Sequence, residues 1–296
     1  MSVLYYTTVW TDFIWERPTL KIWEAIIYGV LGGVTELLPI SFSGHATVFR
    51  GVFNLSPLNE GGGLYIRVGI CLGIIFAIFL SFRMEARAAG REISSMLFHR
   101  NRRRRRTNPL RRSILMGGIV LIPMLFSLIF MAWAERITRL LFVALFFAIN
   151  GTVIYFCSRG KAGARNERDL VLPEAAIIGF SRMLSVFPGM SSVGTSLSVG
   201  HVSNFSTYFN LRFCFLVTLV FQGISLLYHL IRAFAYGAFS GGIFLGMLVA
   251  MSFAAIFGYL AIQYLKYLVH KNKLHVFAYY CWDAVAIVLI VSLINA

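Results

Sequence analysis

The residues best suited to chemistry lie around prolines that interrupt apolar stretches of the chain. Next to Pro39 the sequence places a carboxylate, an imidazole and two hydroxyls: Glu36, His45, Ser41 and Ser43. A carboxylate and an imidazole this close along the chain can bind a metal ion, exchange protons or position a phosphate. Charged side chains inside apolar segments are rare and usually functional, so we expect a reaction or binding site here. A structural charge that is paired inside the protein is the alternative.

A second cluster follows Pro188 and Gly189 and is rich in hydroxyl groups. It comprises Ser191, Ser192, Thr195 and Ser196. Hydroxyls and open backbone amides near the start of a helix suit an anion such as phosphate. The same residue types cap helices and allow close helix packing, so a structural role stays open as well.

Two arginines within apolar segments offer the positive charge that a phosphate requires. Arg67 lies near the start of one apolar stretch, and Arg182 lies shortly before the second break. A guanidinium can donate two parallel hydrogen bonds to phosphate oxygens, which makes each residue a candidate clamp. Each could instead extend its charged end to the lipid head groups.

The elements that must position these residues are membrane-spanning helices. The chain has 296 residues, of which 58% are hydrophobic, against roughly 45–50% in soluble domains. Crossing a bilayer takes roughly 20 helical residues. Six apolar segments meet this length: 64–82, 113–133, 139–157, 209–232, 241–265 and 276–295. We therefore expect an all-α integral membrane protein, with residues 1–296 forming a single membrane domain.

The segments at about 20–53 and 174–201 carry the proline breaks and are predicted to form re-entrant helical hairpins. In lipid an open backbone amide has no water to bond, so a broken helix survives only inside protein or beside a wet cavity. Two breaks in corresponding places typically mark a site between inverted repeats. We expect one repeat at about 20–133, a second at about 174–265 and a last span at 276–295. Two unrelated kinks are the alternative.

The basic residues gather between spans and give the protein a formal net charge of +15. An excess of Lys and Arg in short loops is typical of the cytoplasmic side of a membrane protein. The clusters are Arg100, Arg102 to Arg106, Arg111 and Arg112; Arg159, Lys161, Arg165 and Arg168; and Lys266, His270, Lys271 and Lys273. Their location favours a topology signal over nucleic-acid binding. The Arg102–Arg106 run could also attract anionic lipids.

The cysteines and the N-terminus indicate which features we do not expect. The four cysteines are widely separated and form no CxxC pair, so neither a disulfide nor a cysteine-bound metal is indicated. The N-terminus lacks a basic region followed by an apolar core and a small-residue cleavage site. No cleaved signal peptide is therefore predicted.

At the two breaks the chain resembles the undecaprenyl-pyrophosphate phosphatase family, the integral-membrane enzymes linked to bacitracin resistance. The family's first motif is similar to E-G-x-T-E-F-L-P-[IV]-S-S-T-G-H, and residues 32–45 read GGVTELLPISFSGH. Its second motif is similar to P-G-x-S-R-S-x-x-T, and residues 188–196 read PGMSSVGTS. The resemblance in span layout covers essentially the whole chain.

Three of the departures from the family pattern replace residues that could act in the reaction. Gly32 stands in place of the first glutamate, Phe42 in place of a serine proposed as nucleophile, and Ser192 in place of the arginine. Near the start of the third segment, Arg67 stands where the family tends to have a glutamate. These departures leave intact, reduced and altered activity as alternatives. Arg67 or Arg182 is a hypothetical source of the missing positive charge.

The resemblance implies metal-assisted hydrolysis of undecaprenyl diphosphate to undecaprenyl phosphate and phosphate, in the bacterial inner (plasma) membrane. Glu36 would hold Mg²⁺ or Ca²⁺, which bind carboxylate oxygens, and His45 would act as acid/base or nucleophile. The phosphate would be bound by the remaining candidates, Ser41, Ser43, Ser191, Ser192, Thr195 and Arg67. Such an enzyme would recycle the lipid carrier of cell-wall synthesis and confer bacitracin tolerance.

Two non-enzymatic functions are the alternatives. Broken helices in inverted repeats also suit a polyprenyl-phosphate transporter or flippase, and the motif departures suit a lipid-binding protein that has lost catalysis. An arginine and a metal-binding carboxylate that converge near His45 would favour the enzyme. A cavity open alternately to both sides would favour transport. The expected partners are a polyprenyl diphosphate lipid and the bilayer, not nucleic acid.

Overall fold

The computed structural model describes residues 21–98, 109–134, 139–160, 163–235 and 240–294. Within these ranges the chain is helical and has no named β-strand. The helices are α2 (Ile22–Leu37), α3 (Phe42–Phe53), α4 (Gly61–Ser81), α5 (Arg83–Phe98), α6 (Pro109–Ala134), α7 (Leu140–Cys157), α8 (Leu172–Met183), the 3₁₀ helix η2 (Leu184–Val186), α9 (Ser192–Val202), α10 (Thr207–Ala235), α11 (Gly241–His270) and α12 (Val276–Ile294). The all-α class is confirmed.

Six helices in the described residues are long and apolar enough to cross a membrane: α4, α6, α7, α10, α11 and α12. They coincide with the six predicted spans, and the bounds differ by a few residues. For example, α10 occupies Thr207–Ala235, where the hydropathy pattern predicts 209–232. The prediction of six spans is therefore confirmed, and the protein is a multi-pass membrane protein. The predicted limits at Leu20 and Asn295 lie outside the described residues.

Helix α5 lies outside the predicted elements. It follows α4 directly and is too charged to count as a span, and none of its residues is buried. Polar and apolar residues recur along it with a helical period, which is typical of a helix at a membrane surface. Such a helix is too short and too charged to stand out as an apolar segment of spanning length.

The two broken segments are helix pairs with similar local chemistry. Helix α2 stops before Pro39 because proline has no N–H and clashes with a preceding helical turn. The Ser41 hydroxyl then caps α3 by accepting from the Gly44 N–H at 3.4 Å. In the second pair the chain passes through η2 and Pro188, and the Ser191 hydroxyl caps α9 by accepting from the Gly194 N–H at 3.1 Å.

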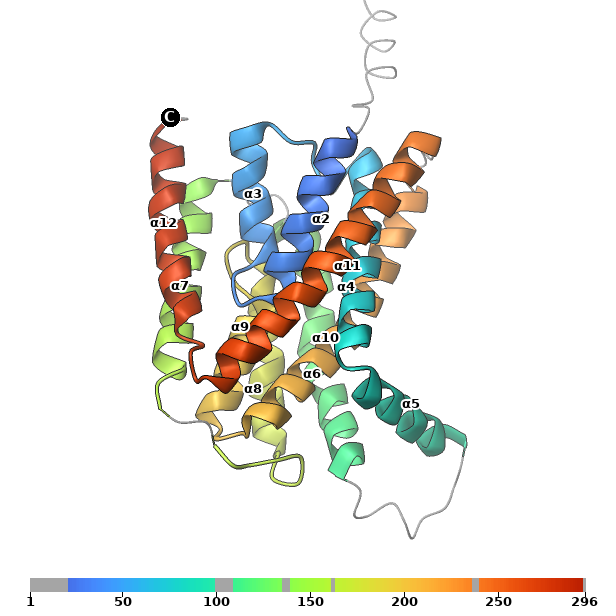
Figure 1. Cartoon of the computed structure of the whole chain (residues 1–296), viewed down its shortest axis with the longest axis vertical. Coiled ribbons are helices and arrows are strands. Elements are labelled where there is room, and N and C mark those ends of the chain that lie inside the picture. Colours follow the sequence, from blue (N-terminus) through green and yellow to red (C-terminus); the bar gives the residue numbers. More distant parts are fainter. Residues whose placement is uncertain (1–20, 99–108, 135–138, 161–162, 236–239, 295–296) are drawn as a thin grey trace, which may run out of the picture.

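The pairs α2–α3 and α8–α9 point toward each other from opposite ends of the bundle (Figure 1). The outer ends of α2 and α3 lie at the upper end in this view, and the outer ends of α8 and α9 lie at the lower end. Helix α2 packs against α11, and α8 packs against α6. Opposed orientation is the geometry expected of the predicted hairpins. The re-entrant depth and the repeat limits, 20–133 and 174–265, stay predictions.

The described parts of the basic clusters adjoin one end of the bundle. The starts of α6 and α8 and the ends of α7 and α11 all lie toward the lower end of the view (Figure 1). This common end is consistent with the positive-inside pattern. Arg100, the Arg102–Arg106 run and Lys161 lie outside the described residues.

Candidate active site

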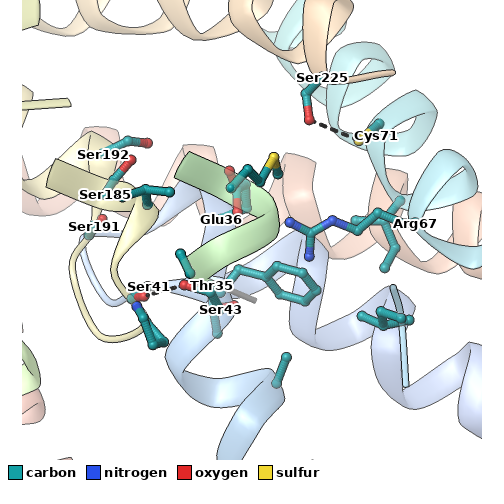
Figure 2. Close-up of a pocket in the computed structure, with 18 of the residues that line it drawn as sticks. Thr35, Glu36, Ser41, Ser43, Arg67, Cys71, Ser185, Ser191, Ser192 and Ser225 are labelled. Carbon is teal, nitrogen blue, oxygen red and sulfur yellow. Dashed lines mark hydrogen bonds between the residues drawn. The ribbon is translucent and has the colours of Figure 1, made fainter. Parts of the chain in front are cut away.

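The tips of the two helix pairs are residues 38–45 of the first pair and residues 184–195 of the second. A cavity of about 180 Å³ lies where the two tips meet (Figure 2). Its walls come from α2, α3, α4, α6 and α10 and from the turn between α8 and α9. The predicted site residues that line it are Glu36, Ser41, Ser43, Arg67, Ser191 and Ser192. His45 and Thr195 are not among the lining residues. The fold therefore brings six of the eight predicted residues to one cavity.

Direct hydrogen bonds join the two tips. The Gly189 N–H donates to the Ser41 hydroxyl at 3.0 Å, and the Ser191 hydroxyl donates to the Leu38 carbonyl at 3.3 Å. The approach is close enough to demand glycine, because a Cβ at Gly44 would lie 2.8 Å from the Gly189 nitrogen. Gly189 itself has φ +115°, a conformation that side chains disfavour. The motif glycines thus permit the contact between tips.

Asn150, fully buried in α7, bridges both tips. Its amide nitrogen donates to the Pro39 carbonyl at 3.1 Å, and its amide oxygen accepts from the Ser191 N–H at 3.0 Å. The same nitrogen lies 3.3 Å from the Cys281 sulfur in α12. A helix break leaves backbone groups without helical partners, and an apolar interior offers no water to replace them. Asn150 supplies those partners and so fixes the distance between the tips.

Glu36 is the carboxylate of the cavity. Gln222, from α10, donates its amide N–H to Glu36 Oε1 at 2.9 Å. Arg67 and Arg182 both lie close enough to act electrostatically on the carboxylate, and Figure 2 shows the Arg67 guanidinium directed toward Glu36. An arginine therefore converges on the motif carboxylate, but not beside His45, which does not line the cavity.

Two of the three motif departures pack against α4, Phe42 against Arg67 and Gly32 against Ile70. The Arg67 guanidinium lies over the Phe42 ring, 4.7 Å from its centroid, which is a favourable cation–π arrangement. A Cβ at Gly32 would lie 2.5 Å from the Ile70 Cγ2, so Ile70 fills the space that a larger residue would need. We call Gly32, Phe42, Arg67 and Ile70 the repacked corner, and the last three of these residues line the cavity.

Arg182 reaches the site from behind the cavity wall. Its side chain is 1% exposed and donates to the Thr218 hydroxyl at 2.6 Å and to the Cys214 sulfur at 3.4 Å. Its Nε has no hydrogen-bond partner among the described residues. Arg182 is not a lining residue. Its positive charge therefore acts on the cavity, but a ligand there would not touch its side chain.

His45 faces away from the cavity, toward α7 and α12. Its Nδ1 lies 2.7 Å from the Ser41 carbonyl and its Nε2 lies 2.9 Å from the Tyr280 hydroxyl. A carbonyl can only accept, so Nδ1 carries the proton, and in the neutral ring Nε2 accepts from Tyr280. The ring also packs edge-on against Phe147. The acid/base or nucleophile role of His45 stays a prediction.

The hydroxyls of the second tip differ in accessibility. The Thr195 hydroxyl donates to the Ser191 carbonyl at 3.0 Å inside α9. Ser192 lines the cavity and is half-buried. The structure thus places Ser192 in position to contact a ligand and places Thr195 one turn further along the helix. The phosphate-binding roles of both residues stay predictions.

A divalent cation fits the site in one specific way. The described residues contain no group of three or more His, Cys, Asp and Glu side chains that would enclose a metal. Glu36 provides one carboxylate beside serine hydroxyls and the Gln222 amide. Mg²⁺ commonly takes one or two protein carboxylates and completes its shell with substrate phosphates and water. The donor set suits that mode of binding and not a cage built from protein alone.

Three residues of this site are not predicted by the sequence motifs. Asn150, Gln222 and Tyr280 contact the tips or Glu36 from spans that are distant in the sequence. Asn150 and Gln222 are polar residues in the middle of apolar segments. That position alone marks them as candidates, although it does not say which residues they contact.

Comparison with known proteins matches residues 25–288 to the family described as bacitracin resistance protein BacA. A protein of Methanobrevibacter smithii named undecaprenyl-diphosphatase is 29% identical, over 89% of this chain and 95% of its own. One of Halothermothrix orenii with the same name is 27% identical, over 92% and 99%. A Bacillus cereus protein named undecaprenyl-diphosphatase 3 is 24% identical, over 91% and 96%. These names support an enzyme of that type. With the family match covering most of the chain, the protein belongs to the BacA family.

Proposed function

We propose that the protein hydrolyses undecaprenyl diphosphate to undecaprenyl phosphate and inorganic phosphate, in the plasma membrane of a bacterial cell. Family membership and the names of the relatives support the reaction. The observation that carries it here is the charge balance around the cavity. One carboxylate, Glu36, lines the cavity with Arg67, and Arg182 acts on it electrostatically from behind the cavity wall. This excess of positive charge in an apolar surrounding favours an anionic ligand.

The diphosphate would bind between the first tip and Arg67. The guanidinium of Arg67 is the lining cation nearest Glu36 and can donate paired hydrogen bonds to phosphate oxygens. Ser43 and Ser192 are half-buried lining residues that add neutral donors. Together they would stabilise charge that develops on the transferred phosphoryl group. In this arrangement Arg67 supplies the positive charge that the family motif places at position 192.

Glu36 would hold a Mg²⁺ or Ca²⁺ ion, with Gln222 fixing the carboxylate through its hydrogen bond. When bound, the ion would neutralise phosphate charge and polarise the phosphoryl oxygens. Ser41 would hold the two tips in position, because its hydroxyl accepts from the Gly189 and Gly44 N–H groups. His45 would likewise act through Ser41, whose carbonyl it binds.

The comparisons favour the phosphatase over the transporter and lipid-binding alternatives. Every relative named above carries a phosphatase name and covers most of this chain. The repacked corner also supports a rearranged site. It places Arg67 in the cavity that Ser192 lines, so Arg67 can supply the positive charge that the motif arginine would have supplied. We therefore expect activity despite the three motif departures.

The test is phosphate release from undecaprenyl diphosphate by the purified protein, first with chelator and then with Mg²⁺ or Ca²⁺ restored. Wild-type protein should release phosphate only with the ion, and Glu36→Ala should lose at least about a hundredfold in rate. Ser252→Ala, a hydroxyl removed from the exposed face of α11, is the control. Lipid binding without release by the wild type would overturn the proposal and favour a binding or transport function.

A further inference from the structure

Arg50 is a lining residue that neither motif contains. It lies in the last turn of α3 and its side chain is exposed. Ser43, Thr47 and Arg50 all line the cavity, and their spacing of four and three residues puts them on one face of the helix. Seven residues rise about 10 Å along a helix. The α3 face therefore leads from the tip, at Ser43, to the outer end of the cavity, at Arg50.

Other cationic and polar groups gather at this outer end. Asn59, in the loop before α4, lines the cavity, and its carbonyl accepts from Arg232 at 3.1 Å. Tyr28, also a lining residue, donates its hydroxyl to the Ser56 carbonyl at 2.8 Å. Arg50 and Arg67 both act electrostatically on Tyr28. Tyr28 thus lies within electrostatic reach of Arg50, in the last turn of α3, and of Arg67, which also acts on Glu36.

Neither Arg50 nor Arg67 belongs to an ion pair among the described residues. The pairs Arg165 with Glu174 and Arg212 with Glu167 involve no residue that lines this cavity. Glu24, a buried residue of α2, is the acidic group that also acts on Tyr28. An exposed, unpaired guanidinium at the entrance to a site for an anion attracts that anion before it reaches the interior.

We propose that Arg50 forms an outer phosphate-binding subsite at the mouth of the cavity. It receives the diphosphate headgroup as it enters and holds inorganic phosphate as it leaves, while Arg67 serves the phosphoryl group next to Glu36. This inference rests on the proposed phosphatase function for its role in turnover. The phosphate-binding property itself is independent of catalysis.

An outer subsite affects binding more than chemistry. Interactions made equally by the bound substrate and the transition state change KM and leave kcat unchanged. Loss of Arg50 should therefore raise KM for the lipid diphosphate and the inhibition constant for inorganic phosphate together. Both effects should weaken at high ionic strength, because an exposed charge is screened by salt.

The experiment compares Arg50→Gln, Arg50→Lys and the remote control Arg87→Gln, an exposed arginine of α5. In Arg50→Gln, KM and the phosphate inhibition constant should each rise about tenfold, with kcat changed less than about twofold. Arg50→Lys should recover most of the loss because it keeps the charge. Arg87→Gln should match the wild type, although it removes the same charge from the protein.

A binding measurement without substrate separates this inference from the proposed function. Inorganic phosphate should raise the melting temperature of the wild type and of Arg87→Gln, and should do so less in Arg50→Gln.

If the wild type hydrolyses the lipid but Arg50→Gln has unchanged KM, phosphate inhibition and phosphate protection, the outer subsite is refuted and the function stands. If nothing is hydrolysed but phosphate protection depends on Arg50, the function fails and the subsite stands. A rise in KM without loss of phosphate protection would assign Arg50 to the lipid headgroup and refute its role in phosphate exit.

Discussion

The two broken helix pairs share a local design but present different chemistry to the cavity between them. The first pair contributes Glu36 and Arg50, and α4 adds Arg67 beside it. The second tip contributes hydroxyls, among them Ser185 and Ser192. Both breaks consist of a proline followed by a capping serine. Two breaks with the same capping chemistry can therefore differ in charge, because the charged residues that line the cavity come from the first pair and α4.

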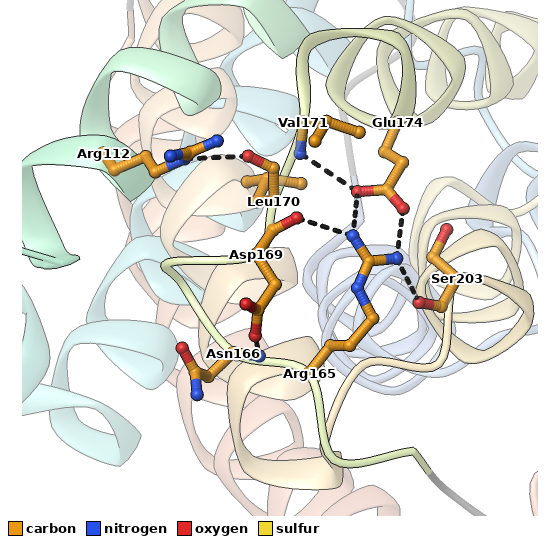
Figure 3. A network of polar contacts seen from close by, with 8 residues as sticks. All are labelled: Arg112, Arg165, Asn166, Asp169, Leu170, Val171, Glu174 and Ser203. Carbon is orange, nitrogen blue, oxygen red and sulfur yellow. Dashed lines mark hydrogen bonds and ion pairs between the residues drawn. The ribbon is translucent and has the colours of Figure 1, made fainter.

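The pairs also differ in how their outer ends are held. At the base of the second pair Arg165 donates to Glu174 in α8 at 2.5 Å and to the Ser203 carbonyl at the end of α9 at 2.8 Å (Figure 3). The hydrogen bond to Glu174 raises the pKa of the Arg165 guanidinium above its usual value. The first pair ends in exposed residues, including Arg50 and Phe53. Arg165 therefore ties the outer ends of α8 and α9 together, whereas the outer end of α3 carries the exposed Arg50 at which we propose that the ligand enters.

Removal of the positive charge beside Glu36 should have the largest effect. Arg67→Gln is expected to lower kcat/KM for undecaprenyl diphosphate by about 100- to 1000-fold, as when an oxyanion donor is removed. The kcat/KM of Arg67→Lys should lie between those of the wild type and Arg67→Gln, because an ammonium keeps the charge but loses the forked donor geometry. Steady-state phosphate release measures both. Retention of activity within about threefold in Arg67→Gln would exclude this residue as the phosphate clamp.

Asn150→Ala should uncouple the tips. Two buried backbone groups, the Pro39 carbonyl and the Ser191 N–H, lose their partner, at a cost of about 2–4 kcal/mol in the free energy of unfolding. Thermal unfolding in detergent measures the loss. Thr152→Ala, an exposed hydroxyl on the same helix, is the matched control. Equal melting temperatures for the two variants would show that Asn150 does not hold the tips.

Gly32→Glu tests the repacked corner. A side chain at this position collides with Ile70, so the single variant should lose about 1–3 kcal/mol of stability through overpacking. Ile70→Ala in the same chain should relieve the collision and recover part of the loss. The melting temperatures of both singles and the double variant decide the question. Additive losses, with no recovery in the double variant, would contradict the packing account.

Glu174→Gln should have the smallest effect. It weakens the ion pair with Arg165 but keeps an oxygen that can accept from the Val171 N–H. Since the pair is partly exposed, the expected loss of stability is about 1 kcal/mol or less. Phosphate release should be unchanged. A loss of stability as large as that of Asn150→Ala would show that the base of the second pair, and not the contact between tips, controls the site.

The spans and breaks could be predicted because each depends on local sequence. A long apolar run forms a helix in lipid wherever its contacts lie, and Pro39 and Pro188 end helices through their own ring geometry. The partners of the tips could not be predicted, because they depend on which distant helices pack together. Asn150 lies 111 residues from Pro39 and 41 residues from Ser191, and Gln222 lies 186 residues from Glu36. The direction of His45, away from the cavity, likewise depends on Tyr280 in the last helix.

Restoration of activity by a relocated charge is the most direct test of the central claim. Arg67 and Ser192 line the same cavity, and the family motif places an arginine at position 192. We predict that Arg67→Gln/Ser192→Arg releases phosphate at least about tenfold faster than Arg67→Gln. Ser192→Arg alone reports whether the new side chain is tolerated. A double variant that is as stable as Ser192→Arg but no more active than Arg67→Gln would contradict the account.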